Sequence, residues 1–200
     1  MKATQALPEN YSLAWSLDLK HNLRLNIILQ LTGLAWMAVS GWLLGFCILW
    51  LRPEVKQSLP GAGFQVNLLG GLVVLLLVMA VAISLHELVH GLFFWLFSKR
   101  RPLFGLGSGY AYAAMPDWYF PKMQYLVIGL APLLVLTGLG LAASLIVPLA
   151  GLGALFAGLV INAGGAIGDL YVCWRIARED PQVWVRDTGD GFQLYRRVDG

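Results

Sequence analysis

Four long apolar segments constrain the fold of this chain more than any other feature of its sequence. They cover about residues 25–51, 64–97, 123–149 and 151–177. Because about 20 consecutive apolar residues cross the hydrocarbon core of a bilayer as a helix, each segment is long enough to span it. Charged residues make up only 12% of the chain, roughly half the share usual in a soluble domain. We therefore predict an all-α integral membrane protein, a single domain of residues 1–200 with four transmembrane helices.

Lysine and arginine residues flank these segments unevenly. One side holds most of them: Lys2, Lys20, Arg24, Lys99, Arg100, Arg101, Lys122, Arg175 and Arg178. The other side has only Arg52 and Lys56, in the connector 52–63. Since basic residues accumulate on the cytoplasmic side, we expect a multi-pass protein of the plasma (cytoplasmic) membrane with both termini cytoplasmic. We expect contact with the lipid bilayer and not with nucleic acid, and no cleavable signal peptide in the polar residues 1–12.

Three stretches outside the apolar segments have the pattern of β-strands. Residues 13–19 alternate apolar with small or polar side chains, the period of a half-buried strand. Residues 104–114 are glycine-rich with alternating aromatics, and the cytoplasmic tail 178–200 has two strand-like runs around the turn DTGDG. These patterns predict small β elements at the cytoplasmic face, either joined in a sheet or left as unconnected interfacial loops. Cys47 and Cys173 lie inside apolar segments and are expected to be buried free thiols.

The second apolar segment contains ISLHELVHGLFF, which places three ionisable side chains inside an apolar run. Ionisable groups at that depth are costly, so they need a compensating interaction. His86 and His90 are four residues apart and project from one face of a helix. Two imidazoles at this spacing fit two positions of a tetrahedral zinc, and Glu87 beside them fits the base that holds an attacking water in an HExxH site. The alternative is a helix whose polar groups make hydrogen bonds to neighbouring helices.

A catalytic zinc needs three protein ligands, so a further residue must join the two histidines. Apart from Glu87, the only acid inside an apolar segment is Asp169, since the other candidates lie in polar flanks: Asp117, Glu179 and Asp180. His90 and Asp169 lie about 14 Å and about 9 Å along a helix from the basic residues that follow them, so their depths are similar. The small residues GGAIG before Asp169 allow close helix approach. We predict Asp169 as the third ligand, with a helix-end residue reaching to the interface as the alternative.

Asn162 precedes Asp169 by seven residues, two helical turns, and faces the same way. It is a candidate to bind the substrate backbone or donate to an oxyanion, and equally a candidate for an inter-helix contact. Pro132 is expected either to kink the third segment and open room near the site, or simply to be tolerated there. His21 has no partner motif and is interpreted as a surface residue.

On HELVH and the later NAGGAIGDL, this chain resembles the membrane zincin peptidases of a domain-of-unknown-function family. It is more distantly similar to the site-2 protease group of intramembrane metalloproteases. The resemblance covers the second to fourth apolar segments, and it implies a role for five residues: His86 and His90 as metal ligands, Glu87 as catalytic base, Asp169 as third ligand and Asn162 as a substrate contact. The distal motif lacks the prolines of the site-2 pattern, and Leu170 follows the aspartate where that pattern has glycine.

These features predict a membrane-embedded peptidase that uses Zn²⁺ to hydrolyse peptide bonds of a membrane protein or peptide substrate at or within the membrane. Zinc would acidify the attacking water, and Glu87 would carry its proton to the leaving amine. The stretch 104–114 would pair with an unwound substrate by edge addition. The alternative is a non-catalytic metal-binding sensor or carrier in the membrane, which has no need for an acid such as Glu87 that stays off the metal.

Overall fold

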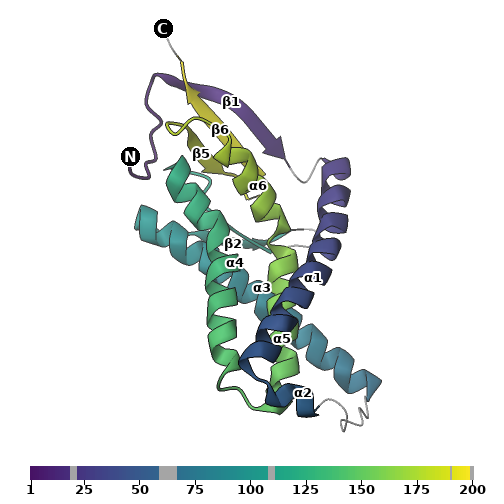
Figure 1. Ribbon diagram of the computed structural model, residues 1–200. Coiled ribbons are helices and arrows are strands. Elements are labelled where there is room, and N and C mark those ends of the chain that lie inside the picture. The colour runs from purple at the N-terminus through teal and green to yellow at the C-terminus, as the bar shows by residue number, and fades with distance from the viewer. Residues whose placement is uncertain (19–21, 59–66, 108–110, 190, 199–200) are drawn as a thin grey trace.

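A computed structural model describes residues 1–18, 22–58, 67–107, 111–189 and 191–198, and these are mostly helical (Figure 1). In chain order the helices are α1 (Leu23–Leu51), α2 (Glu54–Ser58), α3 (Leu68–Ser98), α4 (Lys122–Ser144), α5 (Leu149–Gly165) and α6 (Ile167–Ala177). The strands are β1 (Tyr11–Asp18), β2 (Leu103–Leu106), β3 (Ala111–Ala114), β4 (Tyr119–Pro121), β5 (Trp184–Asp187) and β6 (Gly191–Arg197).

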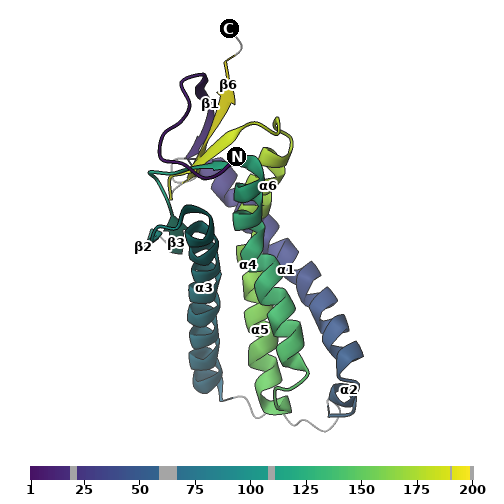
Figure 2. The ribbon, with the colours of Figure 1, turned by 90° about the vertical axis from the view of Figure 1, so that its left-hand side faces the viewer.

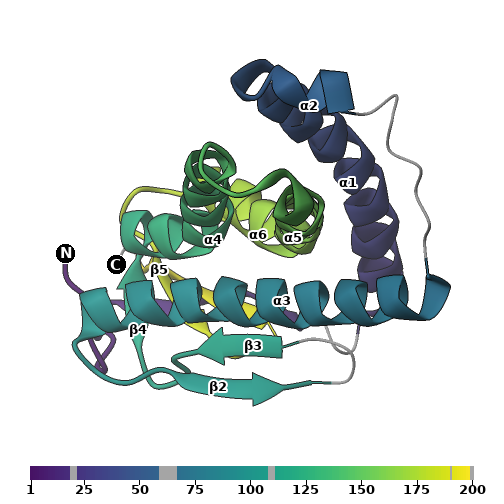
Figure 3. The ribbon, with the colours of Figure 1, turned by 90° about the horizontal axis from the view of Figure 1, so that it is seen from below.

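Three of the described helices, α1, α3 and α4, are each long and apolar enough to cross a membrane. A fourth span is possible by the same criteria if α5 and α6 count as one, although they are bent by 40°. α5 packs against both α1 and α3, while α4 packs against α3, α5 and α6 (Figure 3). α1 and α3 match the predicted segments 25–51 and 64–97 closely, and residues 64–66 lie outside the described part of the chain.

The other two predicted segments, 123–149 and 151–177, need correction. α4 ends at Ser144, and α5 begins at Leu149 directly after Pro148, because the fixed φ of proline suits the start of a helix. The expected continuous last helix is wrong, since it breaks at Ala166, after Gly164 and Gly165. Glycine is a poor helix former, so the sequence is weakest as a helix at this point.

The expected small sheet is confirmed, and the alternative of unconnected loops is wrong. Four strands form an antiparallel sheet in the order β1-β6-β5-β4, and β2 and β3 form a separate antiparallel pair. This pair lies beside one end of α3 (Figure 2). The alternation expected over residues 13–19 is interrupted by an irregularity between Leu13 and Trp15, so Leu17 is buried while Leu13 is exposed. Leu19 lies outside the described residues.

The hydrophobic core joins the four-stranded sheet to the adjoining ends of the helices. It contains Phe94 from α3, Ile128 from α4 and Ile176 from α6, packed against Val185 and Leu194 of the sheet. Both chain ends lie at this end of the molecule (Figure 1). The core therefore fixes where the sheet-proximal halves of α3, α4 and α6 lie relative to one another.

Lys122 has a different role from the flanking charge that the sequence suggested. It is buried, and its Nζ donates to the carbonyl oxygens of Ala177 at 2.9 Å and Glu179 at 2.5 Å. Ala177 is the last residue of α6, where helix carbonyls lack backbone partners, and Glu179 follows two residues later. Lys122 thus holds the start of α4 against the end of α6.

Candidate metal centre

The two histidines of HELVH lie on the buried face of α3. Each is only 8% exposed, and their ring centroids are 4.9 Å apart with planes at 73°. Their spacing of four residues places them one above the other on the helix surface. The histidine pair therefore faces the interior of the helix bundle and not its outer surface.

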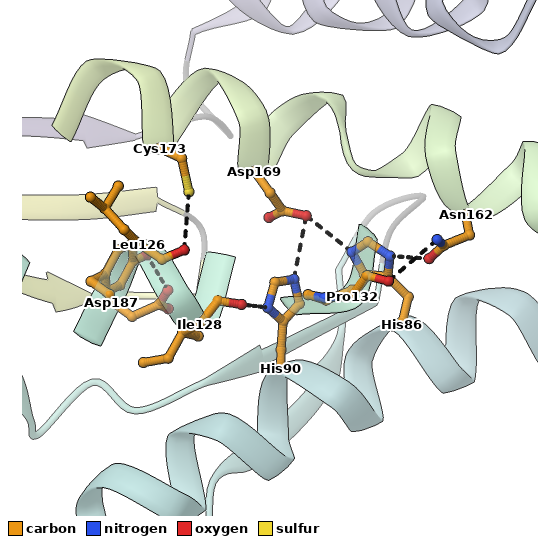
Figure 4. A network of polar contacts seen from close by, with 10 residues as sticks. His86, His90, Leu126, Ile128, Pro132, Asn162, Asp169, Cys173 and Asp187 are labelled. Atoms are coloured by element: carbon orange, nitrogen blue, oxygen red, sulfur yellow. Dashed lines mark hydrogen bonds and ion pairs between the residues drawn. The ribbon is translucent and has the colours of Figure 1, made fainter. Parts of the chain in front are cut away.

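Asp169, in the first turn of α6, points toward both histidines (Figure 4). Its Oδ2 lies 3.0 Å from His86 Nε2 and 3.3 Å from His90 Nε2. One ligand atom from each of the three residues lies within 4.8 Å of the others. The break at Ala166 starts a new helix just before Asp169, and a helix amino terminus favours a carboxylate.

This donor set fits a zinc ion. Zinc binds imidazole nitrogen and carboxylate oxygen at about 2.0–2.2 Å, which puts two ligand atoms of a tetrahedral site about 3.3 Å apart. The two measured nitrogen–oxygen separations, 3.0 and 3.3 Å, are close to that value. With three protein ligands, a bound zinc would keep a fourth position for water, as a catalytic site requires.

The other ring nitrogens have fixed partners on neighbouring helices. His90 Nδ1 lies 3.0 Å from the carbonyl oxygen of Ile128, and His86 Nδ1 lies 3.0 Å from Asn162 Oδ1. A carbonyl oxygen can only accept, so each Nδ1 donates, and each Nε2 is left to face Asp169. With a metal in the site, Nε2 would be the nitrogen that binds it. Asn162 is buried, and its Nδ2 lies 3.4 Å from the carbonyl oxygen of Pro132. Such contacts orient the ligands of metal sites.

Glu87 lies beside this cluster and outside the donor set. One residue along a helix is a rotation of about 100°, so Glu87 projects away from His86. It lines a cavity of about 640 Å³ together with His90 and Asp169. Its carboxyl group lies against the backbone of Ala113 in β3. The cavity thus contains an acid next to, but separate from, the candidate ligands.

The small residues of GGAIG do not bring α6 against α3 as the sequence analysis supposed. A β carbon on Gly164 would lie 2.2 Å from the Met37 side chain of α1, so this glycine permits close contact with α1. A β carbon on Gly165 or Gly168 would meet nothing within 4 Å. These two glycines line the cavity beside Asp169, where they leave space open.

Of the remaining sequence candidates, Cys173 is buried and Cys47 half-buried, and both are free. Asp117 and Asp180 are exposed, whereas Glu179 is buried and forms ion pairs with Arg175 and Arg196. Glu179 is therefore a structural residue of the sheet end. His21 lies outside the described residues.

The sequence analysis missed a second polar pair on the cavity wall, Tyr125 and Asp187. The Tyr125 hydroxyl donates to Asp187 Oδ2 at 2.7 Å, and the Gly189 amide donates to Asp187 Oδ1 at 2.8 Å. Burial raises the pKa of Asp187 to about 6, although both hydrogen bonds oppose this change. Asp187 opens the DTGDG turn, which the sequence marked only as a turn.

We expect Asp187→Asn to be more stable than the wild type at pH 7, by on the order of 2 kcal/mol. The folded-state pKa lies above the unfolded value of 3.8, so ionisation of Asp187 destabilises the fold increasingly as pH rises from about 4 to about 6 and by a constant amount above that. The difference between the two proteins should therefore be constant above about pH 6 and shrink steadily as pH falls toward 4. Thermal unfolding in detergent between pH 4 and pH 8 measures it, with Asp117→Asn, an exposed site, as control. A constant difference across this range would contradict the assignment.

The fold and the site define a helical protein with a His-His-Asp cluster, in which both histidines are buried, and an adjacent glutamate on the HELVH helix. The chain belongs to the family described as “Putative zincin peptidase”, whose model matches residues 79–184, more than half of the chain. The matched region contains both histidines, Glu87, Asn162 and Asp169, and it excludes α1, β1 and β6. Neither the curated proteins nor the solved structures contain a match to this chain.

Proposed function

We propose that this protein is a zinc-dependent peptidase that hydrolyses peptide bonds at or within a membrane. One observation carries the proposal: His86, His90 and Asp169 converge within 4.8 Å, and Glu87 lines the same cavity. Membership of a zincin family supports zinc as the metal and peptides as the substrate class.

The outer surfaces of the helices support a membrane location. In the most apolar stretch of α3 only 6% of the residues are buried. Many large apolar side chains of α3 are about half exposed or more, among them Leu72, Leu75 and Leu77. Such a surface is unfavourable in water and matches lipid. Lys99, Arg100 and the basic end of α6 lie near the sheet, so we propose that the sheet end is cytoplasmic.

The proposed chemistry divides the work between the metal and Glu87. When bound, zinc supplies a Lewis acid that acidifies water and polarises a carbonyl group. His86, His90 and Asp169 would hold it, and the Nδ1 contacts of the two histidines fix the tautomer in which Nε2 can bind the metal. Glu87 accepts the proton of the attacking water and passes it to the departing amine.

In this proposal Asn162 contacts a metal ligand and not the substrate. Its oxygen is occupied by His86 Nδ1 and its nitrogen by the Pro132 carbonyl, and both contacts are buried. Of the two roles considered for Asn162, this arrangement favours the inter-helix contact. We propose that it orients His86.

The substrate would bind as an extended strand along β3. A helical peptide hides its peptide bonds, so it must unwind before cleavage. Among the described strands, β3 pairs only with β2, and its residues 111–113 line the cavity that contains Glu87. A peptide added to the remaining edge would pass beside Glu87, with main-chain hydrogen bonds giving affinity.

Metal removal tests this proposal. Protein purified in detergent is expected to carry one zinc per chain, to lose cleavage of unfolded membrane-derived peptides on treatment with a chelator, and to recover it when zinc is returned. Metal content is measured by mass spectrometry of the elements, and cleavage by mass spectrometry of the product termini. Full cleavage by metal-free protein would overturn the proposal. Zinc binding without cleavage of any peptide would instead indicate a metal-binding sensor or carrier.

A further inference from the structure

Pro132 lies inside α4, within the bundle. Proline has no backbone N–H, so the carbonyl of the residue four positions earlier, Ile128, lacks its usual helical donor. The proline ring also crowds that carbonyl. A carbonyl group left without a donor in an apolar environment is costly, so it needs a partner from outside its own helix.

His90 provides that partner. Its Nδ1 lies 3.0 Å from the Ile128 oxygen, where it donates, and both residues are buried. This hydrogen bond fixes the rotation of the ring and directs Nε2 toward Asp169, with 3.3 Å between Nε2 and Oδ2. In a helix without proline, the Ile128 oxygen would already accept from the amide of residue 132.

The same turn of α4 also reaches the other histidine. The carbonyl oxygen of Pro132 lies 3.4 Å from Asn162 Nδ2, and Asn162 Oδ1 lies 3.0 Å from His86 Nδ1 (Figure 4). The amide nitrogen of Asn162 thus faces α4, and its amide oxygen faces the imidazole of His86. Residues 128 and 132 therefore orient both imidazoles, one directly and one through Asn162.

We propose that the proline-containing turn of α4, residues 128–132, is the element that orients both metal-binding histidines, and that Pro132 is a positioning residue because it lacks an N–H. The inference rests on the proposed metal centre. It also gives proline in this helix a definite task beyond bending the helix or being tolerated in it. The effect on metal binding should resemble that of losing other hydrogen bonds behind metal ligands, about 10- to 100-fold in affinity.

Pro132→Ala returns an N–H that competes with His90 for the Ile128 oxygen. We expect zinc affinity, measured by competition with a chromophoric chelator in detergent, to fall by about 10-fold or more. In ¹⁵N-histidine NMR spectra of the metal-free protein, the hydrogen-bonded Nδ1–H signal of His90 should shift or disappear. This second measurement requires neither zinc nor activity, so it remains informative if the proposed function fails.

A backbone ester at position 132, introduced as the α-hydroxy analogue of alanine, separates the missing N–H from the proline ring. It lacks the donor as proline does but has no ring, so we expect zinc affinity and the His90 signal to stay close to those of the wild type. The same ester at Leu139, an exposed position of α4, controls for the chemical replacement. Wild-type behaviour of Pro132→Ala would overturn the inference. An equal loss of zinc affinity in the alanine and ester variants would also overturn it, because the effect would then come from removing the proline ring and not from adding an N–H. If Pro132→Ala does not fold, the ester variant alone tests the inference: wild-type zinc affinity would support it, and a loss of affinity would overturn it.

Discussion

Glu87→Gln should bind one zinc per chain, as the wild type does, and cleave peptides at least 100-fold more slowly. Glutamine has nearly the shape of glutamate, and the side chain lies outside the cluster of His86, His90 and Asp169, so the metal should remain. An amide cannot take a proton from water at neutral pH, and general-base catalysis by a placed carboxylate is typically worth about 10²–10⁴ in rate.

The measurement pairs zinc content with the rate of product formation in the same preparation. Glu9→Gln makes the same chemical change at an exposed site in the amino-terminal segment and should leave both quantities unchanged. Full-rate cleavage by Glu87→Gln would show that Glu87 is not the base. Loss of zinc from this variant would place Glu87 among the ligands instead.

Asp169→Asn should lose zinc at concentrations that saturate the wild type, with an affinity at least 100-fold weaker, and should lose cleavage with it. The substitution keeps the size of the side chain but removes the charge, and Asp169 supplies the only described carboxylate within reach of both imidazoles. Mutation of a residue that only hydrogen-bonds to a metal ligand typically lowers metal affinity by about 10- to 100-fold. Loss of a ligand itself should lower it further.

Zinc affinity by chelator competition checks this expectation, and Asp117→Asn, an exposed aspartate before α4, is the matched control. Asp169→Ala extends the test, because alanine offers no ligand atom at all. Stoichiometric, tightly bound zinc in Asp169→Ala would mean that another residue completes the site.

The sequence predicted the parts of this structure that depend on local spacing. The four-residue interval of His86 and His90 sufficed to place them on one face, and the rarity of acids in apolar segments singled out Asp169. Similar distances from the basic flanks then placed Asp169 near the histidines in depth. The structure brings these three residues together, and their roles as ligands stay a prediction.

Other features escaped because they depend on contacts between distant segments. The Ile128 carbonyl has no side-chain signature, and only the pairing of α3 with α4 reveals that it accepts from His90. The Tyr125–Asp187 pair joins residues 62 positions apart. The sheet order was equally hidden, since periodicity identifies a strand without naming its neighbour. The break at Ala166 was suggested by glycines that the sequence analysis assigned to helix packing.

The ladder between β1 and β6 has a consequence for the cavity next to the candidate metal ligands. Tyr11 lies opposite Arg197 and Asp18 opposite Gly191, so β1 and β6 are paired along their whole length although they are far apart in the sequence. Gly191 and Phe192, in this ladder, also form part of the cavity wall. Removing β6 would thus leave every candidate metal ligand in place while taking two residues from the wall of the cavity beside them. The β1–β6 ladder is therefore part of the framework of the site that we propose, although it supplies no candidate ligand.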